Sequence, residues 1–98
     1  MKHLRVTGQA ESDLDEIWLY VARDNIGAAN RLLDVLTTSF GVLAHSPELG
    51  RDRSEMKAGL RSHVSGNYVI YYRIAPECVE ILRVLHGARD PQRAFGIY

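Results

Sequence analysis

The sequence predicts an α+β domain: a short strand, two antiparallel helices, a three-stranded antiparallel sheet packed on them, and a short tail. Residues 10–44 carry apolar side chains at helical spacing. Residues 60–86 are dense in β-branched and aromatic residues with turn signals between them. A polar stretch over 50–59, expected to be a loop, separates the two parts. At 98 residues, the chain is expected to form one domain over 1–98.

The first elements are a strand and an acidic amphipathic helix. His3–Thr7 alternates over a short length, which suits a first strand. The next apolar residues share one helical face: Ala10, Leu14, Ile17, Trp18, Val21 and Ala22. Carboxylates crowd the first turns of this helix, where they favour the positive end of its dipole. The turn-prone Asp24–Gly27 ends it.

A second helix is predicted over roughly 28–44. Its main apolar stripe consists of Ala29, Leu32, Leu33, Leu36, Phe40, Leu43 and Ala44. Val35 and Val42 lie on a second flank, so we expect this helix to pack on both the sheet and the first helix. The short connection predicts an antiparallel helical hairpin. Ser46–Gly50, which contains Pro47, ends the second helix.

The second half of the chain predicts strands joined by tight turns. The expected strands are Leu60–Val64, Tyr68–Ile74 and Val79–His86. The last strand is apolar on both faces, which indicates a central place in the sheet. The tail that follows is short, with a helical turn expected at Pro91–Phe95.

Composition narrows the possible functions. The net charge is zero, but residues 1–50 hold seven acidic and four basic side chains. Residues 51–98 hold five acidic and eight basic side chains, of which seven are arginine. Such a basic half suits an acidic partner or nucleic acid, and an ordinary solvated surface is the alternative explanation. One cysteine excludes an internal disulfide, and the apolar runs are too short for a membrane span or signal peptide, so we expect a cytoplasmic protein.

No metal or cofactor site is expected. The four histidines are far apart in the sequence, and a single cysteine gives no zinc pattern. No glycine-rich loop joins a strand to a helix, and there is no nucleophile elbow. We therefore assign no catalytic residue.

Basic side chains on and after the predicted strands are the remaining chemical signal. Arg61 and His63 precede the tyrosine-rich hairpin, and neighbouring strands can bring them near the later cations Arg83, His86, Arg89 and Arg93. Arginine with histidine beside an RNA phosphate suits ribonuclease chemistry. Salt bridges to Glu55, Glu80 and Asp90 are the alternative explanation.

Two residues do not fit the polarity of the face on which they are predicted to lie. Arg83 is predicted on the same face as Val79, Ile81 and Leu85, where a charge is either paired or lies in a groove that a partner fills. Leu19 lies opposite the apolar face of the first helix, next to Tyr20. It is therefore a candidate contact for a protein partner.

Five short sequence segments, in this order across nearly the whole chain, resemble those of the ParE/RelE toxin superfamily. They are Asp13–Ala22, Ser46–Arg51, Gly59–Ser62, Gly66–Arg73 and Val79–Asp90. The resemblance implies a toxin fold with two activity branches. RelE-like members cut messenger RNA on the ribosome with basic residues on the central strands and commonly a tyrosine near the C-terminus. ParE-like members inhibit DNA gyrase.

The sequence is closer to the ParE branch. Arg89 matches the arginine after the last strand, and Arg61 is a candidate for a basic strand position. However, Val69 stands where RelE-like enzymes place an arginine, and Phe95 stands at the late aromatic position and cannot transfer a proton. Tyr98 keeps the ribonuclease open as an alternative.

The resemblance thus implies a non-enzymatic toxin that binds DNA gyrase, blocks replication and is neutralised by a ParD-like antitoxin. It implies no membrane association, and no sequence-specific binding of nucleic acid by the toxin alone. The candidate contacts with gyrase or antitoxin are Arg61, Arg83, His86, Arg89, Arg93 and Leu19. The alternatives are a ribosome-dependent endonuclease using Arg61, His86 and Arg89, and a degenerate toxin that serves only as a complex partner or DNA-binding co-regulator.

Overall fold

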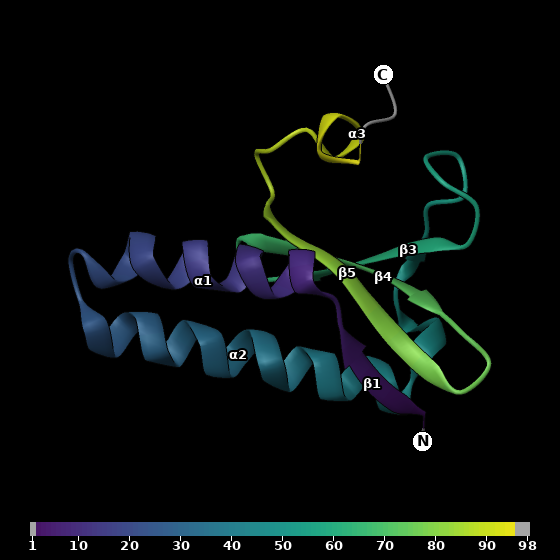
Figure 1. Ribbon diagram of the computed structural model, residues 1–98, viewed down its shortest axis with the longest axis horizontal. Helices are drawn as coiled ribbons and strands as arrows, with labels where there is room; N and C mark the ends of the chain where they lie inside the picture. Colours follow the sequence, from purple (N-terminus) through teal and green to yellow (C-terminus); the bar gives the residue numbers. More distant parts are fainter. Residues whose placement is uncertain (1, 96–98) are drawn as a thin grey trace.

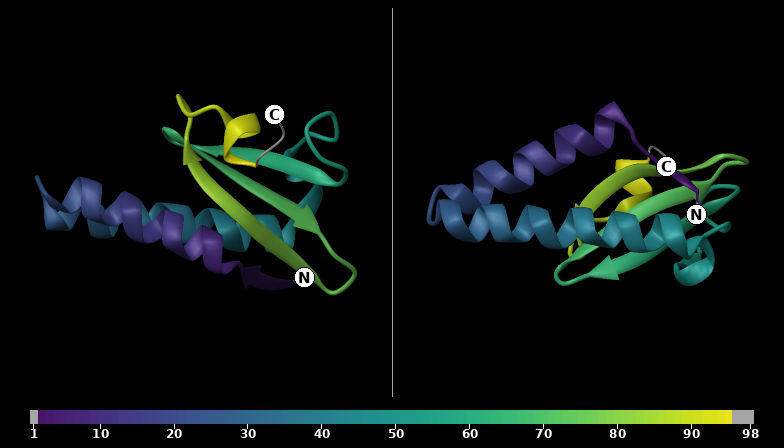
Figure 2. Two further views of the ribbon diagram at one scale, coloured as in Figure 1. Left: turned by 45° about the horizontal axis from the view of Figure 1, so that its top comes forward. Right: turned by 90° about the horizontal axis from the view of Figure 1, so that it is seen from below.

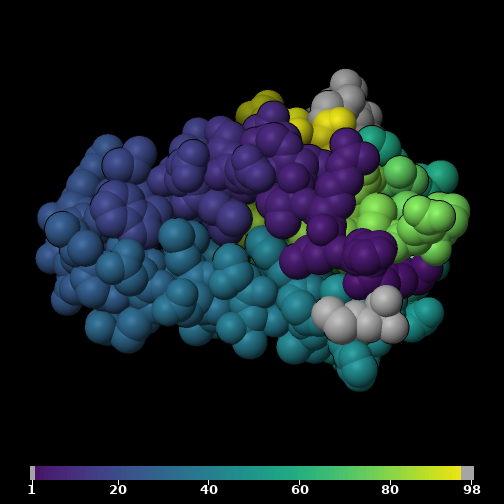
Figure 3. Space-filling view, turned by 60° about the horizontal axis from the view of Figure 1, so that its bottom comes forward, coloured from purple at the N-terminus to yellow at the C-terminus, as the bar shows by residue number. Residues whose placement is uncertain are grey.

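The computed structural model describes residues 2–95 and confirms the α+β class (Figure 1). The elements are β1 (His3–Val6), α1 (Gly8–Ala22), α2 (Ile26–His45), the 3-10 turn η1 (Pro47–Leu49), β2 (Arg51–Asp52), β3 (Leu60–Ser65), β4 (Tyr68–Ile74), β5 (Cys78–His86) and α3 (Pro91–Ala94). Helices α1 and α2 form the predicted antiparallel hairpin, and together they cover much of the side of the molecule seen in Figure 3.

The sheet has five strands in the order β1-β5-β4-β3-β2. Strands β2 to β5 pair antiparallel in sequence, whereas β1 pairs parallel with β5. β5 lies between β1 and β4, as its apolar character on both faces predicts. The prediction that residues 50–59 are all loop was wrong, because Arg51 and Asp52 pair with β3 as an edge strand. Both residues are exposed and polar, so no apolar alternation indicates this strand.

Side-chain caps fix where the two long helices begin. The Thr7 side chain accepts a hydrogen bond from Ala10 N at the start of α1. Asn25 caps α2 in the same way by accepting from Ala28 N. Helix α2 therefore begins at Ile26, two residues before the predicted start, since Asn25 is the cap of the second helix as well as part of the turn.

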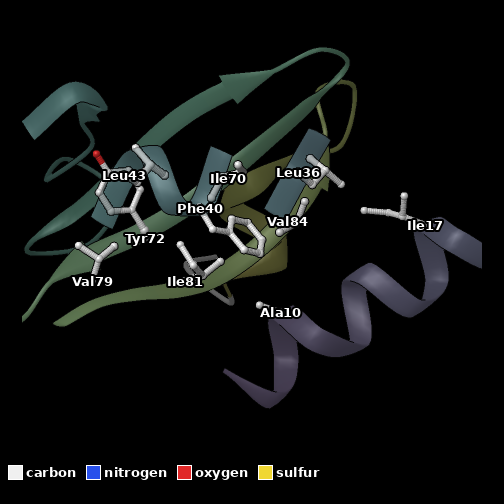
Figure 4. Packing of buried hydrophobic residues seen from close by; sticks show 10 residues of the cluster. All are labelled: Ala10, Ile17, Leu36, Phe40, Leu43, Ile70, Tyr72, Val79, Ile81 and Val84. Atoms are coloured by element: carbon white, nitrogen blue, oxygen red, sulfur yellow. The ribbon is translucent and has the colours of Figure 1, made fainter. Parts of the chain in front are cut away.

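The core lies between the helical hairpin and one face of the sheet (Figure 4). Its buried residues are Ala10, Ile17, Leu36, Phe40, Leu43, Ile70, Tyr72, Val79, Ile81 and Val84. The Tyr72 hydroxyl donates to Pro47 O and accepts from Gly50 N, which ties the η1 turn to the core. The expectation that Val35 and Val42 also pack was wrong, because they are 53% and 44% exposed on the solvent side of α2.

A second apolar cluster covers the other face of the sheet. It contains Met56, Leu60, Tyr71 and Leu85, with Ala94 and Phe95 packed against it. The rings of Tyr71 and Phe95 meet edge to face with centroids 5.3 Å apart. The predicted helical turn, α3, thus lies on the side of the sheet away from α2 (Figures 1 and 2).

A β-bulge in β5 changes which side chains share a face. Tyr71 pairs with Arg83 and Tyr72 pairs with Ile81, so Leu82 has no partner in β4. Before the bulge Ile81 faces the helices, and after it Val84 does. Leu85 belongs to the second cluster. The prediction that Arg83 and Leu85 share a face with Ile81 was therefore wrong, since strict alternation does not hold across the extra residue.

Candidate functional site

A groove with a volume of about 610 Å³ lies between α1 and the C-terminal end of β5. We call it the α1–β5 groove. Its lining residues are Asp13, Glu16, Ile17, Leu19, Tyr20, Arg23, Tyr68, Val84, Leu85, His86 and Arg89. The first five come from α1, Arg23 is the residue that follows this helix, and the others come from the β4–β5 hairpin and the turn after β5. The groove therefore joins a helix surface to the end of the sheet.

Large apolar side chains remain uncovered on the helical wall of this groove. Leu19 is 57% exposed and Tyr20 is 71% exposed. Across from them, burial raises the pKa of the Tyr68 hydroxyl, and the neighbouring Tyr20 adds to that rise. Two exposed apolar side chains at a groove are a feature of protein-binding surfaces. Leu19, which the sequence predicts as a contact residue, lies on this wall.

Asp13, which lines the groove, belongs to a buried ion pair with Arg83. Asp13 accepts two hydrogen bonds from Arg83, from Nε at 2.8 Å and Nη2 at 2.9 Å, and a third from Val84 N at 3.0 Å. The side chains of Asp13 and Arg83 are only 4% and 11% exposed. This contact fastens α1 to β5 beyond the end of β1.

Arg83 is thus occupied inside the molecule. The hydrogen bond to Asp13 raises the pKa of Arg83, against the effect of burial. Its Nη1 donates to Ala94 O, so the same guanidinium also holds α3. The sequence left two explanations for the charge of Arg83, an ion pair or a groove that a partner fills, and the structure shows the ion pair.

His86 and Arg89 lie at the end of the groove formed by β5. The His86 ring packs edge to face on Tyr68, with centroids 5.5 Å apart, and its Nδ1 accepts a hydrogen bond from Ala88 N. Arg89 is exposed, and within residues 2–95 it makes no ion pair. These two side chains place polar groups next to an apolar wall.

The remaining predicted residues lie elsewhere. The Arg61 Nη2 donates to Glu48 O at 3.1 Å and to Gly50 O at 2.8 Å, which holds the segment around η1. Arg93 is exposed on α3, and Tyr98 lies outside the described residues. The structure therefore brings three of the six predicted contacts together, namely Leu19, His86 and Arg89.

Sequence reasoning missed Tyr68 as a groove residue. Its signal was indirect: Tyr68 pairs with His86 across the hairpin, and cross-strand partners lie on one face. The groove combines apolar side chains with both signs of charge, which suits an amphipathic protein segment.

Among residues 2–95 no three potential metal ligands gather at one point. No helix of the described part is long and apolar enough to cross a membrane.

Comparisons with known proteins match the chain to the ParE family and also find a relative from a RelBE system. The family model described as the ParE toxin of the type II toxin–antitoxin system parDE matches residues 4–91. Toxin ParE1 of Caulobacter vibrioides is 33% identical over 97 residues, covering 98% of this chain and 100% of that protein. A chain of the chromosomal ParDE system of P. aeruginosa has the same fold, with a TM-score of 0.75 at 22% identity, over 88% of this chain and 96% of its own. A chain of the Mycobacterium tuberculosis RelBE2 toxin–antitoxin complex gives 0.66 at 31% identity, over 87% and 96%.

Proposed function

The chain belongs to the ParE toxin family of type II toxin–antitoxin systems, and from this we propose that it stops growth by binding DNA gyrase. A ParD-like antitoxin would neutralise it by occupying the α1–β5 groove. The observation that carries this proposal is the exposed pair Leu19 and Tyr20 beside His86 and Arg89 in one groove. An amphipathic helix or strand with acidic side chains complements such a surface.

The proposed toxin acts by binding and not by catalysis. A ribonuclease using Arg61, His86 and Arg89 would need these groups around one phosphate. Arg61 instead donates to backbone carbonyls of Glu48 and Gly50 and does not line the groove. This arrangement favours the gyrase hypothesis over the RelE-like alternative.

A supercoiling assay with purified DNA gyrase tests the target. We expect the toxin to inhibit supercoiling and to leave gyrase attached to cleaved DNA. The cognate antitoxin should reverse the effect when added in equal amount. An absence of inhibition at large molar excess, combined with codon-positioned cuts in translated messages, would favour the endonuclease instead.

A binding titration with the antitoxin tests the groove. Leu19→Glu places a charge on the apolar wall and should weaken antitoxin binding by about thirtyfold, a change typical of an interface hot spot. Val35→Glu is the matched control, because Val35 on α2 is similarly exposed but does not line the groove. Equal affinities for the two variants would contradict the assignment of the groove.

A further inference from the structure

The solvent side of α2 carries a line of exposed side chains that includes two large apolar residues. Val35 and Val42 are both exposed, and because they lie two helical turns apart, they follow one side of the helix. Thr38 lies between them, and Arg31 and His45 continue the line at spacings of four and three residues. All five residues are exposed. We call this line the α2 seam.

The α2 seam is an uncovered surface that is separate from the proposed antitoxin site. In the view from below, α2 lies in front of the sheet, and none of residues 2–95 covers it (Figure 2, right). No seam residue lines the α1–β5 groove. Alternate spacings of three and four residues are the pattern with which two helices pack side by side. The seam therefore has the form of a helix-pairing surface.

Charged side chains along the seam are arranged so that the surface complements itself. Arg31 and Asp34 lie in the first half of α2, His45 ends the helix, and Glu48 follows in η1. None of these four side chains makes an ion pair within residues 2–95. In an antiparallel pair of α2 helices centred between residues 39 and 40, Arg31 of one copy opposes Glu48 of the other, and Asp34 opposes His45. A two-fold axis repeats both contacts.

Gly41 lies beside the seam, in the interior of α2. Glycine weakens a helix interior relative to alanine. A Cβ at Gly41 would meet no neighbouring atom within 4 Å, so the packing of a single copy does not require glycine there. The same antiparallel centring places Gly41 opposite Thr38 of the second copy, where the absent side chain lets the two helices approach closely.

We propose that the α2 seam is a two-fold interface between two copies of this chain, with their α2 helices antiparallel. Antiparallel packing places the positive end of each helix next to the negative end of the other. One helix from each copy is a small interface, so the dimer should be weak, with a dissociation constant on the order of 10 µM. The proposal goes beyond gyrase and antitoxin binding and does not depend on either.

Sedimentation equilibrium of the full chain, at protein concentrations from about 1 to 200 µM, tests the interface. Arg31→Glu and Glu48→Arg each place like charges opposite each other at two points of the dimer. Each variant should therefore weaken dimerisation about tenfold at low salt. Arg93→Glu makes the same charge change on α3, outside the seam, and should stay within about twofold of the parent. Val42→Glu should weaken the dimer about a hundredfold, because the two-fold axis doubles each loss.

An equimolar mixture of Arg31→Glu and Glu48→Arg gives the sharpest test. In the mixed dimer every contact again joins opposite charges, so the mixture should dimerise within about threefold of the parent. Mixing would not restore a variant that had misfolded, and circular dichroism of each variant checks folding directly. The antitoxin titration is run far below the dissociation constant of the dimer, so Val35→Glu remains a valid control there.

Three results would overturn the proposal. The first is a parent protein that stays monomeric at the highest concentration. The second is a mixture that dimerises no more tightly than either single variant. The third is a dimer that Val42→Glu leaves unchanged, because another surface would then form it. If the parent is monomeric and Val42→Glu abolishes antitoxin binding, the seam belongs to the antitoxin instead.

Discussion

Removing the Asp13 carboxylate should destabilise the fold more than any other change to a charged side chain of the groove. Asp13→Ala deletes the acceptor for Arg83 and for Val84 N. It leaves a guanidinium in a site where its side chain is only 11% exposed. Breaking one partner of a buried pair costs about 3–5 kcal/mol. That is a large fraction of the 5–15 kcal/mol that is typical for the stability of a small domain.

The coupling between the two residues gives a sharper test than the single variant. Arg83→Met replaces the guanidinium with an apolar side chain of similar length. In the double variant, Asp13→Ala with Arg83→Met, no buried charge is left unpaired. The double variant should therefore be more stable than Asp13→Ala alone, although the backbone N–H of Val84 still lacks its partner.

Urea unfolding followed by circular dichroism measures all of these free energies. Asp13→Asn is included because an amide oxygen can still accept a hydrogen bond, and its loss should be about 1–3 kcal/mol. Asp15→Ala on the exposed side of α1 is the control and should stay within about 0.5 kcal/mol of the parent. Strictly additive effects in the double variant, or a loss below about 1 kcal/mol for Asp13→Ala, would refute the reasoning.

Three other outcomes follow from the structure. Tyr72→Phe should lower the unfolding free energy by about 2 kcal/mol, since Gly50 N and Pro47 O lose a buried partner. Tyr20→Phe at the surface should change this free energy little, and thermal melts compare the two variants. Gly50→Ala should destabilise by about 1–3 kcal/mol, because a Cβ there would lie 2.8 Å from Ser62 O and against the Tyr72 ring, and the urea midpoint measures the loss. The hydrogen bond from Arg73, together with the charges of Arg73 and Arg5, lowers the pKa of Glu80. The stability that ionised Glu80 contributes is therefore present above the ordinary glutamate pKa and is lost as the pH falls. Glu80→Gln should flatten the decline of the urea midpoint between about pH 5 and 3.

The sequence alone predicted the order of the main elements, because their signals are local. The stripe that includes Leu36 and Phe40 predicts a helix from its spacing, and the turn at Gly66 predicts the β3–β4 hairpin. Gly66 has a φ of 60°, a conformation that glycine adopts at little expense. Local patterns of this kind persist in the folded protein because the tertiary contacts agree with them.

The rest could not be predicted, because it depends on contacts between distant segments. Nothing near Arg83 indicates that its partner is Asp13, which lies 70 residues earlier. The bulge beside Leu82 has no side-chain signature, and it reverses the alternation for the residues that follow. The parallel pairing of β1 with β5 joins segments near the two ends of the chain, and no periodic pattern in the sequence indicates it. For the candidate site, Leu19, His86 and Arg89 were identified by type, but their convergence in the groove required coordinates.

The Arg83 guanidinium bonds to Asp13 of α1 and to the carbonyl of Ala94 in α3, so it joins an early helix to the C-terminal turn across β5. A protein segment that enters the α1–β5 groove and shifts α1 would therefore act on α3 as well. Thermodynamic reciprocity requires the converse, so a change that displaces α3 should alter affinity at the groove by the same factor.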